Sequence, residues 1–300
     1  MPTQDSPRYL VTLSLWTTII LWGSAFVGIR VGLQDWGAGS LALVRYLIAS
    51  VGMVVLYRRL PSRQRVSFKD GLQLLGLGII GIGIYNVALN RGEVTVSAGV
   101  ASFVIGLMPL LALWLSVWRL RECITPRMVM GAGVSMLGLA LLVLAERNVH
   151  VGHGVWLVLL AAVAGAVYTV FQKPVLKRFH PIEVTAFAIW GGAFVLLGFL
   201  PDALRDSRHV TPLGWFSVIY LGLFPATIAY ALWSYALSRI PASQASFYLY
   251  GMPVVSTILG VLLLGERPSA LSCAGGVVAV AGAFLASWKR RVKAQRIPIS

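Results

Sequence analysis

The sequence predicts an all-α integral membrane protein, and three observations support this fold class. The 300-residue chain is 58% hydrophobic and only 12% charged, whereas soluble globular domains carry about 25% charged residues. Its apolar residues fall into runs of about 20, the length that crosses a bilayer as a helix. Several short patterns also occur twice along the chain. We therefore expect ten transmembrane helices arranged as two related repeats.

The repeat is clearest in the run Ser102–Pro109, whose counterpart Ser246–Pro253 lies about 144 residues further on. Three further pairs share this offset: Glu122 and Glu266, Gly131 and Gly275, and Gly138 and Gly282. We expect one five-helix repeat over residues 1–146 and a second over residues 147–300, ending in a basic tail. Because five is odd, the second repeat is inverted in the membrane, which is typical of transporters.

The expected spans follow from the apolar runs. The first run is too long for a signal peptide and lacks a small-residue cleavage site, so it is predicted to be the first helix. The ten spans are residues 10–33, 38–57, 71–90, 96–118, 125–145, 153–173, 182–201, 213–236, 243–264 and 269–288.

The basic residues orient these spans, because Lys and Arg are enriched in cytoplasmic loops. With both termini in the cytoplasm, the basic clusters in residues 58–69, 119–127, 173–178 and 289–296 all fall on that side. We expect these clusters to meet anionic lipid headgroups. For the same reason, the net charge of +15 is interpreted as a membrane feature, and no nucleic-acid partner is expected.

Catalytic and cofactor-binding patterns are not found in the sequence. The four histidines lie in expected loops, and no glycine-rich loop ends in Gly-Lys-Ser or Gly-Lys-Thr. The two cysteines, Cys123 and Cys273, lie at different helix ends. We therefore expect no enzyme activity, no cofactor and no metal site. An integral membrane enzyme acting on lipid stays as a weaker alternative, since it would need a cluster of His, Asp or Glu at one interface.

Five short motifs resemble the drug/metabolite transporter superfamily, in its ten-helix EamA branch: Leu21–Phe26, Arg45 with the apolar run after it, Met108–Pro109, Met252–Pro253 and Leu264–Pro268. The resemblance implies a basket of ten helices around a central cavity. Spans 1, 3, 4, 6, 8 and 9 would line this cavity, and spans 5 and 10 would lie at the periphery. It also implies a multi-pass protein of the bacterial inner membrane that exports amino acids, other metabolites or drugs.

Candidate substrate-binding residues are mostly aromatic side chains with a polar atom, located in the spans expected to line the cavity. We expect some of these rings to pack between helices instead. The set is Trp22, Tyr85, Asn86, Met108, Tyr168, Tyr230, Trp233, Tyr248 and Tyr250. A mostly apolar pocket with a few hydrogen-bonding groups suits a small amphipathic molecule, such as an amino acid with an apolar or aromatic side chain.

Two prolines and one arginine complete the predicted site. Pro109 and Pro253 lie near the middle of their spans, where a proline frees a carbonyl and acts either as a hinge or as a static kink. Arg45 lies within a span, where an ionisable residue is costly and usually functional. It either pairs with Glu93 or attracts the carboxylate of a substrate.

No Asp or Glu falls at the expected middle of the membrane, where proton-coupled carriers often keep a proton relay. We therefore predict a facilitator that moves a small-molecule substrate down its gradient by alternating access. We expect a monomer, with an oligomer as the alternative. Proton-coupled efflux of drugs or metabolites is the alternative.

Overall fold

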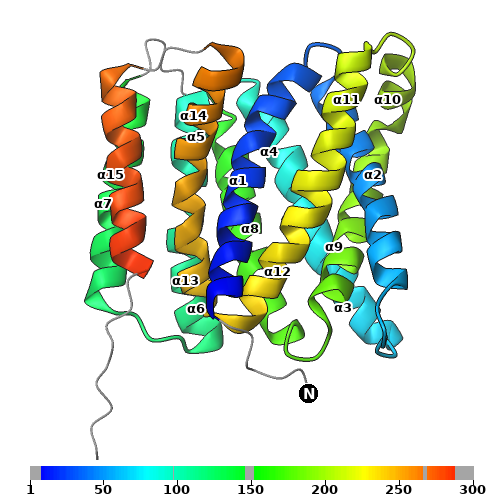
Figure 1. Ribbon diagram of the computed structural model, residues 1–300, viewed down its shortest axis with the longest axis horizontal. Coiled ribbons are helices and arrows are strands. Elements are labelled where there is room, and N and C mark those ends of the chain that lie inside the picture. The colour runs from blue at the N-terminus through cyan, green and yellow to red at the C-terminus, as the bar shows by residue number, and fades with distance from the viewer. Residues whose placement is uncertain (1–7, 97, 146–151, 266–268, 288–300) are drawn as a thin grey trace, which may run out of the picture.

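The computed structural model describes residues 8–96, 98–145, 152–265 and 269–287, and its regular elements there are helices (Figure 1). In these residues nine helical segments are long and apolar enough to cross a membrane. They correspond to the first nine expected spans. The tenth expected span contains a shorter apolar helix over Ala270–Ala286, so a count of ten crossings stays a prediction.

Short connections join successive helical segments, and several spans consist of more than one segment. In chain order they are α1 (Arg8–Gly32), α2 (Ala38–Arg58), α3 (Phe68–Gly78), η1 (Ile79–Ile84), α4 (Tyr85–Glu93), α5 (Ala98–Ile105), α6 (Met108–Leu120), α7 (Pro126–Leu144), α8 (Val155–Val175), α9 (Pro181–Leu196), η2 (Leu197–Phe199), α10 (Leu200–Asp206), α11 (Pro212–Leu221), η3 (Gly222–Ile228), α12 (Ala229–Arg239), α13 (Ala242–Phe247), η4 (Tyr248–Gly251), α14 (Met252–Leu264) and α15 (Ala270–Ser287).

The outer surface of the bundle is apolar, as a lipid solvent requires. Large side chains such as Trp114, Trp118, Phe216 and Leu262 are about two-thirds or more exposed. In water such surface would cost about 25 cal/mol per Å². In hydrocarbon it costs little, so these residues mark the lipid-facing sides of α6, α11 and α14.

Four of the crossings are interrupted at matching places in the two halves of the chain. The π-helices η1 and η3 interrupt the third and eighth spans. The fourth span is divided between α5 and α6, and the ninth between α13 and α14, with the 3₁₀ helix η4 between them. The sequence repeat is therefore accompanied by repeated breaks in the helices.

The division of the fourth and ninth spans corrects the expectation for Pro109 and Pro253. Each proline lies in the first turn of a new helix, α6 or α14, and not inside a continuous one. A first-turn proline removes no helical hydrogen bond, because that N–H group has no partner within the helix. The helix therefore breaks before each proline, and the choice between a hinge and a static bend at this break stays a prediction.

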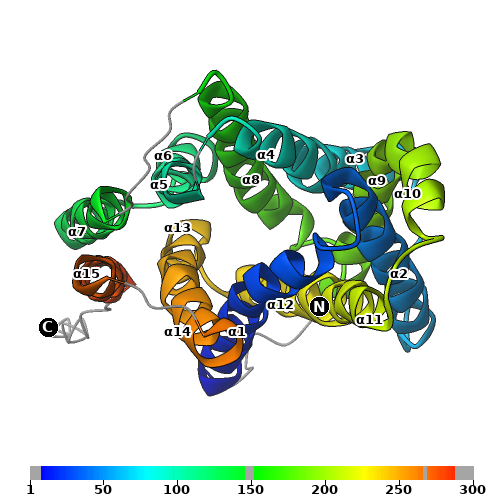
Figure 2. The same cartoon turned by 90° about the horizontal axis from the view of Figure 1, so that it is seen from above.

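Helices α7 and α15 form a pair at one edge of the molecule, as Figure 2 shows. A Cβ atom placed on Gly282 would lie 2.4 Å from the backbone nitrogen of Ser135, and one on Gly138 would lie 2.5 Å from the carbonyl oxygen of Gly275. The Ser135 hydroxyl also donates to the carbonyl of Ala279 over 2.8 Å. Small residues thus allow close backbone approach, which stabilises helix pairs in lipid.

The close packing of α7 on α15 leads to a prediction for two alanine variants. Gly282→Ala should lower the free energy of unfolding by about 1–3 kcal/mol, because its new methyl group overpacks the interface. A Cβ atom added at Gly133, on the partner helix α7, meets nothing within 4 Å, so Gly133→Ala should be neutral or stabilising by up to about 1 kcal/mol. Thermal unfolding in detergent measures both, and equal shifts would contradict the interface.

Candidate functional site

Five aromatic rings meet in the interior between α1, α2, α8 and α12, and we call them the aromatic cluster: Trp22, Tyr46, Tyr168, Tyr230 and Trp233. The Tyr230 ring lies at the centre, with its centroid 5.1 Å from that of Trp22, 6.3 Å from Tyr168 and 6.5 Å from Tyr46. Trp22 also contacts Trp233, with a centroid separation of 5.3 Å. The angled ring contacts are favourable and hold the rings in place.

The π-helices position the two central polar residues of this region. Tyr230 follows η3 directly after Ala229, and Asn86 follows η1 directly after Tyr85. A π-helical turn re-aims the side chains that come after it and is frequent at functional sites. Within η3, the carbonyl of Pro225 accepts a hydrogen bond of 3.0 Å from the indole nitrogen of Trp22, which fixes the ring against the interrupted helix.

A polar edge borders the cluster at the junction of α2, α4 and α12. The Arg45 guanidinium donates to the Oδ1 atom of Asn86 over 2.9 Å and lies 4.7 Å from the centroid of the Tyr46 ring. The Asn86 amide donates to the carbonyl of Ile82 over 2.7 Å. The hydroxyl groups of Tyr46 and Tyr230 are 3.3 Å apart, which connects the polar edge to the rings.

A second polar group continues from the cluster along α8, α9 and α12. The Thr185 hydroxyl donates to the Ser234 hydroxyl over 2.8 Å, and Ser234 in turn donates to Gln172 over 3.4 Å. The buried amide nitrogen of Gln172 has no hydrogen-bond partner among the described residues. This open donor beside the rings can bind an acceptor on a ligand.

Five of the nine predicted substrate residues meet at the cluster and its polar edge: Trp22, Asn86, Tyr168, Tyr230 and Trp233. The others lie elsewhere. Tyr85 and Met108 face Gly165 of α8, Tyr248 pairs with Trp16 at a centroid distance of 5.8 Å, and Tyr250 packs beside Phe247 in the core near α15.

A central cavity, as the family resemblance implies, stays a prediction. Two shallow cavities lie instead along α9. One, of about 260 Å³, runs from Val66 to Leu75 on the side of α3 and includes Phe187. The other, of about 220 Å³, lies between Leu47 on α2 and Trp190 on α9. No predicted substrate residue lines either of these two cavities.

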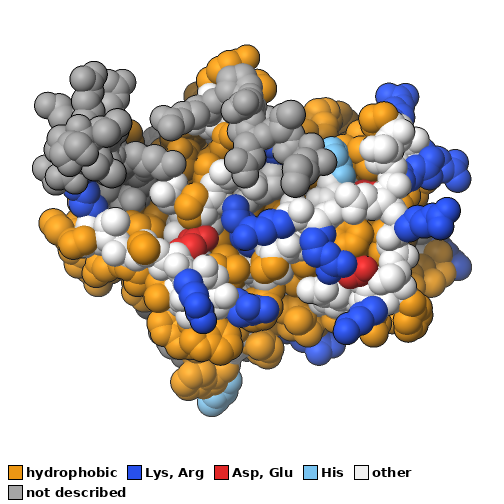
Figure 3. Space-filling view, turned by 90° about the horizontal axis from the view of Figure 1, so that it is seen from below, with side chains coloured by type: hydrophobic (Ala, Val, Ile, Leu, Met, Phe, Trp, Pro, Cys, Tyr) orange, Lys and Arg blue, Asp and Glu red, His pale blue; other side chains and the backbone are white. Residues whose placement is uncertain are grey.

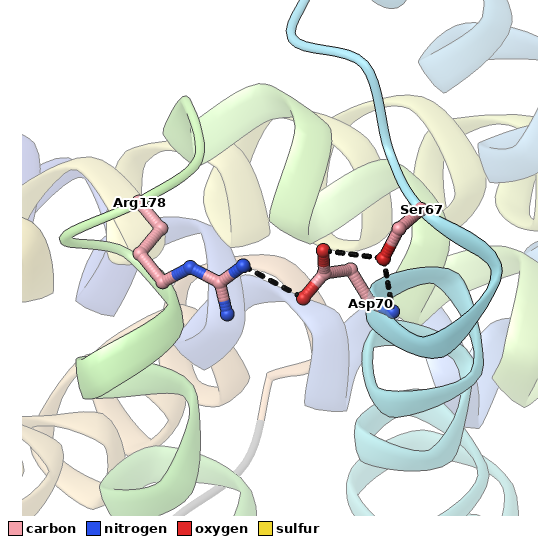
Figure 4. Close-up of polar contacts among 3 residues, drawn as sticks. All are labelled: Ser67, Asp70 and Arg178. Atoms are coloured by element: carbon pink, nitrogen blue, oxygen red, sulfur yellow. Dashed lines mark hydrogen bonds and ion pairs between the residues drawn. The ribbon is translucent and has the colours of Figure 1, made fainter.

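Carboxylates connect the two halves of the chain at one end of the bundle. Figure 3 shows this end with its Lys and Arg side chains, and we call it the basic face. Asp70 at the start of α3 forms an ion pair of 2.8 Å with Arg178, and Ser67 caps the same turn (Figure 4). Glu183 at the start of α9 accepts from the backbone nitrogen of Gln64 over 3.0 Å.

The third tie is made by Glu122, which follows α6. Its two carboxylate oxygens accept from the backbone nitrogens of Ala242 and Ser243 over 2.8 and 3.1 Å, and from the Ser243 hydroxyl over 2.5 Å. A carboxylate at a helix start is favoured by the exposed N–H groups there. Beside it, Lys173 donates to the carbonyls of Leu237 and Ile240. These contacts hold the α12–α13 connection from both sides.

The opposite face has ties of the same kind. Asp35 accepts from the backbone nitrogen of Thr211 over 3.1 Å and from its hydroxyl over 2.5 Å. Asp206 accepts from the backbone nitrogen of Gly37 over 2.9 Å. Asp202, in contrast, forms an ion pair within its own helix, with Arg205 at 3.5 Å.

Comparison with known proteins identifies the family. The model described as "EamA-like transporter family" matches residues 11–144 and again residues 152–288. The chain belongs to the EamA-like transporter family. It is therefore a multi-pass membrane transporter, and the family predicted from the motifs is confirmed.

Two relatives and one solved structure extend this EamA assignment. The chain is 34% identical over 268 residues to the "Probable terminal-alkyne amino-acid exporter" of Streptantibioticus cattleyicolor, which covers 89% of this chain and 90% of that protein. It is 24% identical over 287 residues to the "Probable amino-acid metabolite efflux pump" of Salmonella typhimurium, covering 92% and 94%. A solved crystal structure shares the fold at a TM-score of 0.77 and 22% identity, covering 92% of this chain and 98% of that one.

Some residues of this EamA transporter that make contacts were not predicted from the sequence, and some predicted ones lie outside the described residues. Tyr46 was missed, although its position directly after Arg45 was a usable signal. The ties made by Glu122 and Glu183 were also missed, because the sequence does not show which distant backbone nitrogens a carboxylate meets. The side chain of Glu93, the expected partner of Arg45, lies outside the described residues, as do Glu266, Arg267, Pro268 and the basic tail.

The cap of α9 predicts a pH dependence of stability. The ring nitrogen Nδ1 of His180 accepts from the backbone nitrogen of Ile182 over 3.3 Å, and Glu183 accepts from that of His180 over 2.9 Å. Burial lowers the pKa of His180 from its usual 6.5; nearby Glu183 opposes this shift and Arg239 adds to it. As the pH falls, His180 is therefore protonated in the unfolded chain before it is protonated in the folded protein. The contribution of the cap to the free energy of unfolding is present above about pH 6.5 and is lost as the pH falls further.

The melting temperature should accordingly drop between pH 7.5 and pH 5. His180→Asn keeps a capping acceptor but does not titrate in this range, so it should flatten that drop. Thermal melts of both proteins across this pH range test the cap, and parallel curves would rule out a contribution from His180.

Proposed function

We propose that this transporter exports small amphipathic metabolites, above all amino acids with apolar or aromatic side chains, across the bacterial inner membrane by alternating access. The aromatic cluster with its polar edge carries the proposal. It combines apolar ring faces with hydrogen-bonding groups, the composition of a small-molecule site. It also lies at the contact between the halves, since α1 and α2 come from one half and α8 and α12 from the other.

The orientation and topology belong to the same proposal. Ten crossings in two inverted repeats, with both termini in the cytoplasm, would place the basic face on the cytoplasmic side. The two separate family matches and the repeated breaks at η1 and η3 support a duplicated unit. The names of two relatives, an amino-acid exporter and an amino-acid metabolite efflux pump, support the substrate class.

We infer that transport is facilitative. The described carboxylate side chains that tie the halves lie at the two ends of the bundle and already accept backbone or side-chain donors. A proton-coupled carrier needs a group that takes up and releases a proton as the site changes side. The aromatic cluster and its polar edge offer phenols, an indole pair, an amide and an arginine, with no carboxylate or imidazole among these residues.

Proteoliposomes test this facilitative mode directly. Preloaded protein should exchange labelled phenylalanine in counterflow. A pH gradient imposed alone should not concentrate the label above equilibrium, because no described interior acid couples proton movement to it. Accumulation that collapses when a protonophore is added would contradict facilitation and favour the proton-coupled alternative.

Alternating access requires the ties on the basic face to open in part of the cycle. The Asp70–Arg178 pair is exposed on its Arg178 side, so it adds roughly 0–1 kcal/mol. Glu183 is fully buried and also caps α9, so its removal would damage the fold. Glu122 accepts three hydrogen bonds while part-buried, and such charge-assisted bonds contribute about 1.5–3 kcal/mol each. Glu122 is therefore the tie whose loss should favour opening.

This inference gives a labelling experiment in a background carrying Cys123→Ser and Cys273→Ser. A cysteine is introduced by Ser246→Cys on α13, where Ser246 is fully buried. Glu122→Ala should raise its alkylation rate about tenfold, which corresponds to about 1.4 kcal/mol. Asp202→Ala, which removes a carboxylate paired within its own helix, is the matched control. Equal rates in the two variants would show that Glu122 does not hold this end closed.

A further inference from the structure

Arg45 lies at an unusual depth for a charged residue. It is in the second turn of α2, which begins at Ala38, so at 1.5 Å per residue it lies about 10 Å along the helix. A guanidinium at such a depth is costly unless an anion or several acceptors surround it. The neighbours of this side chain therefore decide what Arg45 is for.

The described surroundings of Arg45 do not neutralise its charge. One terminal nitrogen donates to the Asn86 oxygen over 2.9 Å, and the buried Nε atom has no hydrogen-bond partner there. No described carboxylate lies within ion-pair distance of it. A neutral amide oxygen cannot balance a full positive charge, so an unmet demand for an anion remains beside the aromatic cluster.

The residues around Arg45 are held in place. The Asn86 amide nitrogen donates to the Ile82 carbonyl over 2.7 Å and reaches the Tyr46 hydroxyl at 3.4 Å. This orients the Asn86 oxygen toward Arg45. The Tyr46 ring is almost fully buried and supports the guanidinium at 4.7 Å. The charge is thus fixed at the edge of the site instead of reaching out to lipid headgroups.

We propose that Arg45 binds the carboxylate of the transported substrate, with Asn86 and Tyr46 as positioning residues, while the aromatic cluster receives the apolar part. A planar guanidinium matches a carboxylate through two parallel hydrogen bonds. The hydroxyl contact of 3.3 Å between Tyr46 and Tyr230 places the nearest ring of the cluster next to this charge. The inference rests on the proposed export function and narrows its substrates to carboxylate-bearing molecules.

Counterflow in proteoliposomes tests the proposal with two matched probes, L-phenylalanine and L-phenylalaninamide, which differ in the carboxylate. The wild-type protein should prefer phenylalanine. Arg45→Gln should raise the half-saturating concentration of phenylalanine by about tenfold to a hundredfold and leave that of the amide unchanged. Arg30→Gln removes an arginine of the first predicted span that is exposed near the end of α1, and it should change the half-saturating concentration of neither probe.

A second variant keeps the test valid if Arg45→Gln fails to fold. Asn86→Asp places a carboxylate within 2.9 Å of Arg45 and supplies the missing counter-ion internally. We expect the new ion pair to offset the lost amide donation to Ile82, so that the variant folds but loses its preference for phenylalanine over the amide. Unchanged preference in a folded Asn86→Asp protein would overturn the proposal.

Binding is measured separately as thermal stabilisation in detergent by phenylalanine, phenylalaninamide and inorganic phosphate. Stabilisation by phenylalanine alone, if it is lost in Arg45→Gln, supports the carboxylate site. If no counterflow occurs as well, the transport proposal fails and the carboxylate site stands. Counterflow of both probes at equal rates leaves transport standing and overturns the carboxylate site. Equal stabilisation by phosphate also overturns the carboxylate site. If the protein transports none of the probes and is stabilised by none of them, both proposals are overturned.

Discussion

The structure depends on one constraint, which is that hydrocarbon gives almost no free energy for burying one apolar helix face against another. The helices must therefore be held by close backbone approach and by polar contacts. Helices α7 and α15 use the first solution, with glycines that bring the two backbones into contact. Helices α3 and α9 also approach closely, at Gly191, and carboxylates such as Glu122 and Asp35 add polar contacts that connect the two halves at both ends.

The interruptions in the helices solve a related problem. A continuous helix satisfies its own backbone and offers a ligand only side chains, whereas a π-helical or divided span redirects the residues that follow it. Here η1 is followed by Asn86 and η3 by Tyr230, and both residues meet at the polar edge beside Arg45. Duplication of one unit thus places two similar breaks on either side of a single interior site.

The charges are distributed in a way that suits a carrier of small carboxylates. The described acids lie at the ends of the bundle, where water and backbone donors are available, and none of them is within ion-pair distance of Arg45. Such an arrangement would repel cations and attract an anion toward the aromatic rings. The ties at the ends are hydrogen bonds and an ion pair, which can break and re-form during a transport cycle.

The amino-acid sequence by itself determined the helical class, the first nine spans and the family, because span length and apolar content follow from the thickness of the bilayer. It also pointed to Trp22, Asn86, Tyr230 and Arg45. Only the tertiary structure decided which residues meet: Tyr250 went to the α15 side, and Pro109 came to start a helix. The composition of a segment shows whether it lies in lipid or in water. Which residues a side chain contacts depends on how each helix is rotated about its axis and where it is interrupted, and short-range sequence patterns do not encode this.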